Sequence, residues 1–205
     1  SQSHPLGKPP LQYHFVIDSH VKIFTNARQL IGFEHMSILN TPATTRFERR
    51  RNLTRDLLMA AAAELLVEYG YHKLTIKAIT EYADVGYGTF YVHFSDKDDI
   101  VWAVVHHTAE LWRKDVDDKV HQLPSPQREY QSWVMIFEYA WMMREGIVTM
   151  MGSSGSARLL QNYQNYLAAI HEENLRAGLY SAGLDLPPEF LAQYMAGAIV
   201  RLIVW

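Results

Sequence analysis

Apolar residues recur at three- and four-residue spacing along the chain from residue 52 onward, which predicts a succession of amphipathic helices. The first helix is expected from Asn52 to Gly70, where glycine can adopt a left-handed conformation and end it. A second helix is expected from Thr75, whose hydroxyl can cap its first turn, to about Asp84. Residues 87–93 form a third, short helix in this interpretation.

The remainder of the chain continues the helical pattern. Helices are expected over 96–122, 127–144 and 158–182, the last closed by Gly183, and from residue 189 onward. Residues 146–156 have the glycine and serine content of a flexible loop. Since no segment shows the two-residue period of a strand, the sequence predicts an all-α protein.

The two ends of the chain look different from its body. Residues 1–35 lack the pattern of a signal peptide, and residues 1–45 are expected to be an extension outside the main fold. Whether residues 1–35 are native or appended stays open at this point. The apolar run at the other end stops at Trp205 without a cap, so a further helix is expected to follow.

The amino-acid composition excludes several classes of protein. The chain has 205 residues, of which 48% are hydrophobic and 20% charged, so it can fill a core. Its net charge of -3 excludes a generally basic nucleic-acid coat, and any such contact must come from a local patch. Cysteine is absent, which excludes disulfides and cysteine-ligated metals. No run of about 18 apolar residues occurs, so no membrane contact is expected.

One dense group of arginines precedes and opens the first predicted helix. Its members are Arg46, Arg49, Arg50, Arg51 and Arg55, offset only by Glu48 and Asp56. As a flexible arm, this segment could lie in a minor groove or on phosphates. The alternative interpretation is a solvated run of charge.

The stretch from Leu74 to Ile100 is the most informative part of the sequence. Two short helices joined by a glycine-containing turn are typical of a helix-turn-helix. The second would expose small and hydrogen-bonding residues from Gly86 to Thr89. Small residues let a backbone approach the duplex, and Thr89 offers both a hydroxyl and a methyl group to base edges.

This same stretch resembles the DNA-binding region of the tetracycline-repressor (TetR) family, most specifically at 88–91, His93-Phe94 and Lys97. The resemblance covers about residues 52–120. It implies a helix-turn-helix DNA-binding domain at 46–100 and an effector-binding and dimerisation helical bundle at 101–205. It also implies a homodimer that acts on double-stranded operator DNA in the bacterial cytoplasm, at the nucleoid.

The resemblance assigns roles to individual residues. Thr75 and Lys77 would touch the DNA backbone, and 87–89 would face bases. The full expected DNA-contact set is Arg50, Arg51, Thr75, Lys77, Tyr87, Gly88, Thr89, Tyr91, His93 and Lys97. Three positions depart from the family pattern: Asp84 replaces a usual glycine, Gly86 a usual serine cap, and Tyr87 a basic or small polar residue. The last departure shifts the expected base preference.

The second half of the chain is rich in aromatic residues and methionine, which suggests an adaptable apolar cavity. The expected ligand-binding residues are Trp102, His106, Trp133, Phe137, Trp141, Tyr163, Tyr166 and His171. Ordinary core or dimer packing is the alternative for each of them. The histidines lack metal-ligand spacing, and no nucleophile or dinucleotide motif is complete, so no metal, cofactor or catalytic residue is expected.

The sequence therefore predicts a ligand-responsive transcriptional regulator, most simply a repressor released from a palindromic operator by a small apolar or aromatic effector. The alternative is an effector-binding or adaptor protein of the same fold that acts through protein contacts. An all-α enzyme is a third class, for which no paired acid–base motif is found.

Overall fold

The computed structural model describes residues 45–179 and 186–205, and every regular element in these ranges is an α-helix. The predicted all-α class is confirmed. In chain order the helices are α2 (Arg46–Lys73), α3 (Ile76–Tyr82), α4 (Tyr87–His93), α5 (Lys97–Val120), α6 (Ser125–Met142), α7 (Arg144–Met151), α8 (Ala157–Arg176) and α9 (Pro188–Val204). The predicted extension, apart from Thr45, and the predicted helix end at Gly183 lie outside the described residues.

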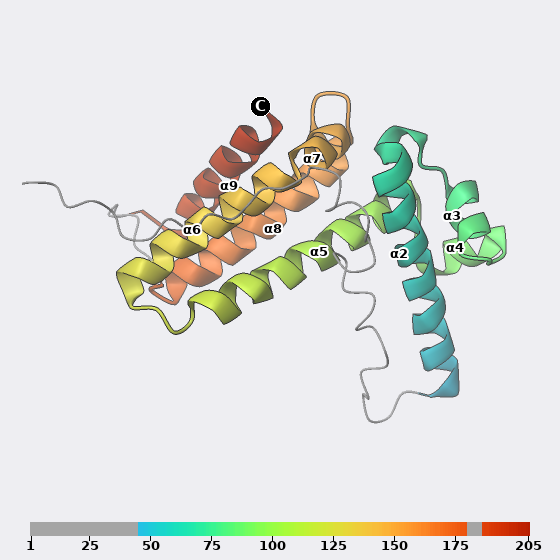
Figure 1. Ribbon diagram of the computed structural model, residues 1–205, viewed down its shortest axis with the longest axis horizontal. Coiled ribbons are helices and arrows are strands. Elements are labelled where there is room, and N and C mark those ends of the chain that lie inside the picture. Colours follow the sequence, from blue (N-terminus) through green and yellow to red (C-terminus); the bar gives the residue numbers. More distant parts are fainter. Residues whose placement is uncertain (1–44, 180–185) are drawn as a thin grey trace, which may run out of the picture.

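The helices gather into two groups that share one long connecting helix (Figure 1). Helices α2, α3 and α4 lie together at one end, and α6 to α9 form a bundle at the other. Helix α5 runs from the first group into the second, packing on α2, α6 and α8. The predicted boundary at residue 100 falls inside α5, so the division into 46–100 and 101–205 stays a prediction.

Helix α2 begins earlier than the sequence pattern predicted. Thr45 caps it: its hydroxyl accepts from the Glu48 amide at 3.2 Å, and its own amide donates to the Glu48 carboxylate at 2.8 Å. This reciprocal pair is a capping box, which satisfies two amides at the start of the helix. The arginines from Arg46 to Arg51 are therefore helical, and the expected flexible arm is wrong.

The end of α2 agrees with the role expected for Gly70 only in part. Gly70 has φ of +74°, a conformation that glycine adopts without steric cost. Gly70 is non-helical, so the regular helix is interrupted there by a kink, and a short further helical segment continues to Lys73.

The structure differs from the predicted helix at 127–144 and loop at 146–156. Helix α6 ends at Met142, and most of the predicted loop is a further helix. Helix α7 occupies 144–151, because Ile147 and Met151 give it a buried apolar face. The true turn is short and closely packed. A Cβ added at Gly155 would lie 2.3 Å from the Met150 carbonyl oxygen, so only glycine fits there. This turn places Ser156, which caps α8 by accepting from the Leu159 amide at 3.2 Å.

Helix α8 ends at Arg176, before the expected end near residue 182. Gly178 has φ of +67°, and the amides of Gly178 and Leu179 donate to the carbonyls of Leu175 and Asn174. These bonds satisfy carbonyl groups that the last turn of a helix leaves open.

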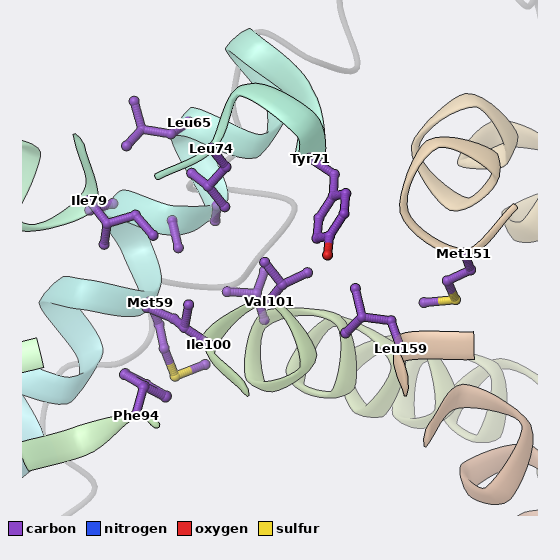
Figure 2. Packing of buried hydrophobic residues seen from close by; sticks show 14 of the residues in the cluster. Met59, Leu65, Tyr71, Leu74, Ile79, Phe94, Ile100, Val101, Met151 and Leu159 are labelled. Atoms are coloured by element: carbon purple, nitrogen blue, oxygen red, sulfur yellow. The ribbon is translucent and has the colours of Figure 1, made fainter. Parts of the chain in front are cut away.

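A continuous apolar core passes through the junction of the two groups (Figure 2). Val101 and Ile100 of α5 are fully buried between residues of α2 and residues of the bundle. On the bundle side, Leu159 and Met151 approach the same helix. Residues of α2, α5 and the bundle therefore belong to one closely packed core. Among the described residues, no helix is long and apolar enough to cross a membrane.

Candidate nucleic-acid interface and ligand site

Helices α3 and α4 form the expected helix-turn-helix. Thr75 caps α3 by accepting from the Ala78 amide at 3.1 Å, as predicted. The turn between the helices is closed by the Val85 amide, which donates to the Thr80 carbonyl at 3.0 Å. Asp84 adopts φ of +52° in this turn, a conformation that explains why a glycine is usual there.

Helix α4 covers the range predicted for it and has two distinct faces. Phe90 is fully buried, and Phe94, which follows the helix, is 3% exposed. These rings anchor the helix to the core. On the other face Tyr87 and Tyr91 are about half exposed. The face is thus held rigidly while its side chains remain available to a partner.

Gly88 lies on this exposed face, and the fold itself does not require a glycine there. A Cβ added at Gly88 would meet no atom within 4 Å, and its φ is not in the left-handed region. Glycine costs helix stability relative to alanine. A glycine that packing does not demand is consistent with close approach of the backbone to an external surface.

The two tyrosines of α4 contact each other. Their rings meet edge to face with centroids 5.7 Å apart, and their hydroxyl oxygens are 3.2 Å apart, a hydrogen bond in which either can donate. This hydrogen bond, together with partial desolvation, raises the pKa of Tyr91 above its ordinary value. Tyr91 therefore keeps its proton at neutral pH and can act as a donor.

A basic group lies where the start of α2 passes the end of α4. Burial lowers the pKa of His93, and the nearby charges of Arg51 and Arg55 lower it further. The Arg55 guanidinium sits over the Phe94 ring, 5.0 Å from its centroid. The structure thus brings together Arg51 and His93 of the expected contact set. Arg50 is exposed on the first turns of α2.

Three further residues of the expected set are placed as follows. Thr75 uses its oxygen to cap α3 and keeps its hydroxyl proton available as a donor. Lys77 is exposed and pairs with Glu81 at 3.8 Å. Lys97 is turned toward α2: its ammonium donates to the Tyr71 carbonyl at 3.2 Å and lies 4.0 Å from the centre of the Tyr71 ring. A phosphate contact by Lys97 would compete with these interactions.

A polar junction ties α2, α5 and α8 together near this site. Asp98 accepts hydrogen bonds of 2.5 Å from the Tyr71 and Ser156 hydroxyls. Arg158 of α8 donates to both carboxylate oxygens of Asp96 and lies 3.6 Å from Asp98. Burial and the Asp98 bond raise the pKa of Tyr71 to about 12. We call Tyr71, Asp96, Asp98, Ser156 and Arg158 the α5 junction.

The expected ligand-binding residues form two groups rather than one. Trp102 and His106 of α5 meet Tyr166 of α8, with the His106 and Tyr166 centroids 5.0 Å apart. Tyr163 stacks on Tyr166, and burial raises its pKa to about 12. Trp102, His106 and Tyr166 line an open hollow of about 400 Å³ together with Asn162.

The second group lies between α6 and α8. Trp133 stacks on His171 with an interplanar angle of 18° and also on Phe137. His171 is 4% exposed, and burial lowers its pKa to about 4. Trp141 belongs to neither group, since it is 75% exposed and lies beside Arg144.

Sequence reasoning missed several residues that line hollows. Asn162 and Asn165 edge the hollow between α5 and α8. A second hollow, of about 430 Å³, lies between α2 and α5, and it shares Trp102 and His106 with the first. Its other lining residues are Arg55, Met59, Asp99, Ala103, His107 and Glu110. Only the helical spacing of these residues could have indicated them. Within 45–179 and 186–205, no three potential metal-ligating side chains gather into a cation site.

Known proteins resemble this chain most clearly over the helix-turn-helix. Residues 58–104 match the family described as bacterial regulatory proteins, tetR family. HbdR, an HTH-type transcriptional regulator of Aromatoleum sp. (strain CIB), is 31% identical over 72 residues. That match covers 35% of this chain and 31% of HbdR, so the chain spans about a third of that relative.

Two other relatives match over a longer range. The fatty acid metabolism regulator protein of Bacillus subtilis (strain 168) is 24% identical over 140 residues, covering 63% of this chain and 72% of the relative. The solved structure of the fatty acid degradation regulator FadR from Bacillus halodurans superposes with a TM-score of 0.49 at 20% identity. The superposition covers 74% of this chain and 82% of that one.

Proposed function

We propose that this chain, whose residues 58–104 match the tetR family of bacterial regulatory proteins, is a repressor released from a palindromic operator by a small effector. The observation that carries the proposal is α4, which buries Phe90 and leaves Tyr87, Gly88 and Tyr91 on an open face. That combination gives a rigid helix with a face suited to the major groove. In this proposal the protein binds operator DNA at the nucleoid.

In this proposal, α4 enters the major groove and divides its contacts by chemistry. Gly88 allows the backbone to come close, and Thr89 meets a base edge. Tyr91 and His93 donate to phosphates, as do the hydroxyl of Thr75 and the ammonium of Lys77. Lys97 joins them only by leaving the Tyr71 carbonyl.

The arginines of α2 contribute phosphate contacts outside the groove that α4 reads. A helix with its side chains is about 10–12 Å wide, whereas the minor groove is about 6 Å wide, so this helical segment does not insert there. Arg50 and Arg51 instead lie along the backbone. Their positive charge releases counterions from the duplex and favours binding at low salt.

The effector is proposed to be a small apolar or aromatic molecule that binds beside α5. Trp102, His106 and Tyr166 offer it ring faces, and Asn162 and Asn165 offer hydrogen bonds at the rim of the hollow. Tyr163 stacks on Tyr166 beside this hollow, whereas Trp133, Phe137 and His171 form the separate group between α6 and α8 and are proposed as a second place for ring contacts. Trp141 is left out of this site because it faces solvent. Fatty acyl compounds join the test panel because the longer sequence match is to a fatty acid metabolism regulator.

Ligand binding reaches the DNA-reading helices through α5. An effector between α5 and α8 shifts these helices against each other, and α5 also packs on α2. The molecule responds only if the effector binds one arrangement more tightly than the other. In a homodimer, that shift changes the spacing of the two reading helices and lowers affinity for the operator.

The test is selection of bound duplexes from a random DNA pool at low and moderate salt. The proposal predicts enrichment of a palindrome by the wild-type chain and loss of that enrichment in Thr89→Ala. The alternative, an adaptor that acts through protein contacts, predicts weak binding with a shallow salt dependence and no enriched sequence. Aromatic and fatty acyl compounds are then titrated against the selected duplex for release.

A further inference from the structure

Tyr87 and Tyr91 occupy successive turns of α4 and form a hydrogen-bonded pair at the exposed face. Their hydroxyl oxygens are 3.2 Å apart, and their rings meet edge to face at 5.7 Å. Tyr91 is held from behind by Phe90, whose ring centroid lies 5.4 Å away and which is fully buried. Tyr87 stands at the first position of the helix and is 54% exposed. The Tyr91 ring thus contacts a core residue, and the Tyr87 ring contacts that of Tyr91.

A tyrosine hydroxyl has one proton to donate, so this pair has two arrangements. If Tyr91 donates to Tyr87, no proton of Tyr91 is left for a phosphate. If Tyr87 donates to Tyr91, the Tyr91 proton is free, and the bond it receives makes it a stronger donor. A phosphate oxygen, which only accepts, selects the second arrangement.

We propose that Tyr87 is a positioning residue that donates its hydroxyl proton to Tyr91 and thereby directs the Tyr91 hydroxyl to a DNA phosphate. This inference rests on the proposed function and changes the role of Tyr87 from base reading to backbone positioning. It also accounts for a tyrosine where a basic or small polar residue is usual, because at this position of α4 a long hydroxyl-bearing side chain reaches the next turn. Base discrimination on α4 then falls to Thr89 and the neighbouring backbone.

The experiment is a double-mutant cycle of Tyr87→Phe and Tyr91→Phe on the duplex that the wild-type chain selects. Each variant keeps its ring and loses one hydroxyl, so the helix packing is retained. Tyr69→Phe is the matched control, since Tyr69 on α2 is 51% exposed. Affinity is measured by fluorescence anisotropy. A second readout uses duplexes in which one phosphate at a time is replaced by a neutral methylphosphonate.

Each single variant is expected to lose about 5-fold in affinity, and the double variant no more than Tyr91→Phe alone. The wild-type chain should lose affinity at one methylphosphonate position per half-site, and both single variants should lose that sensitivity. Tyr87→Phe should select the same duplex sequence as the wild type. Tyr69→Phe should change none of these values.

Two results would overturn the inference while leaving the proposed function intact. In the first, the losses from Tyr87→Phe and Tyr91→Phe multiply, and Tyr87→Phe keeps the wild-type methylphosphonate profile. In the second, Tyr87→Phe selects a different base within the half-site, which returns Tyr87 to base reading. A wild-type chain that selects no duplex would instead contradict the proposed function, and the inference with it.

Discussion

At Gly88, helix stability favours alanine, whereas the proposed close approach to DNA favours glycine. A Cβ there meets no atom of the chain, and alanine favours helix by about 1 kcal/mol over glycine. Gly88→Ala should therefore raise the free energy of unfolding slightly, measured in urea, while lowering affinity for the selected duplex. Gly146→Ala on α7 is the matched control, because its Cβ meets only the end of Met150 at 3.9 Å. Equal DNA affinity of Gly88→Ala and wild type would contradict close backbone approach.

His171 makes the stability of the bundle depend on pH. Burial lowers the pKa of its imidazole to about 4, from an ordinary value of 6.5. As the pH falls from about 6.5 toward about 4, the unfolded chain binds a proton that the folded chain does not, so the free energy of unfolding falls. The stabilisation is present above about pH 6.5 and is lost through this window.

Urea unfolding at about pH 7.5 and about pH 5 measures this effect. His171→Gln should lose less stability between the two pH values than the wild-type chain. His72→Gln, which changes an exposed histidine of α2, should keep the wild-type dependence. A His171→Gln variant with unchanged pH dependence would show that the imidazole is not the group responsible.

At the scale of elements, the first turns of α2 extend as an exposed basic helix. Residues 45–53 are all exposed, so Arg50 and Arg51 can be changed without disturbing a core. Replacing either by glutamine should reduce the slope of log affinity against log salt by about 0.9 for each phosphate that the protein no longer neutralises. Lys114→Gln, at an exposed position of α5, is the control with the same change of charge. An unchanged slope would favour the solvated-charge interpretation of this patch.

The α5 junction joins helices that are distant in sequence. Asp98 accepts from Tyr71 and Ser156, which lie 27 residues before and 58 residues after it. Asp98→Ala should lower the free energy of unfolding by about 1–3 kcal/mol, because two hydroxyls lose a charged acceptor. Asp117→Ala, an exposed position of the same helix, should change it far less. Urea titration decides between them, and equal stability of the two variants would mean that the junction does not join α2 to α8.

Local signals account for the elements that the sequence predicted well. The range of α4 and the cap at Thr75 depend on neighbouring residues alone, and the structure confirms both. The start of α2 was also readable, since Thr45 and Glu48 have capping-box spacing. The turn before α8 is not readable from local signals, because the glycine and serine content around Gly152 and Gly155 indicates a flexible loop, whereas close packing requires these glycines.

The candidate site also has features that the sequence predicts and features that it does not. The exposed face of α4 follows from the helical period, so its residues could be proposed from the sequence. The separation of the aromatic residues into two groups, the inward turn of Lys97 and the α5 junction depend on tertiary contacts, which no local pattern encodes. Trp141 shows the same limit, since its spacing on α6 predicts a helix face but not what covers that face.

At the scale of the whole molecule, α9 presents apolar side chains that suit the proposed homodimer. Phe190, Tyr194 and Leu202 are between 60% and 69% exposed. Exposed apolar patches of this kind mark interaction surfaces, and a two-fold dimer pairs the same patch on both copies. Tyr194→Asp should shift a dimer toward monomer in sedimentation, whereas Tyr130→Asp on α6 should not. A wild-type monomer at micromolar concentration would contradict the two-site mechanism.

The most direct test of the whole account is a hydroxyl-radical footprint of the wild-type chain on its selected duplex. A dimer that places two copies of α4 in successive major grooves predicts two protected stretches on one side of the DNA, with centres about 34 Å apart. A single protected stretch, or no protection on a duplex that the protein binds, would contradict the proposal that this protein binds DNA as a dimer through two copies of α4.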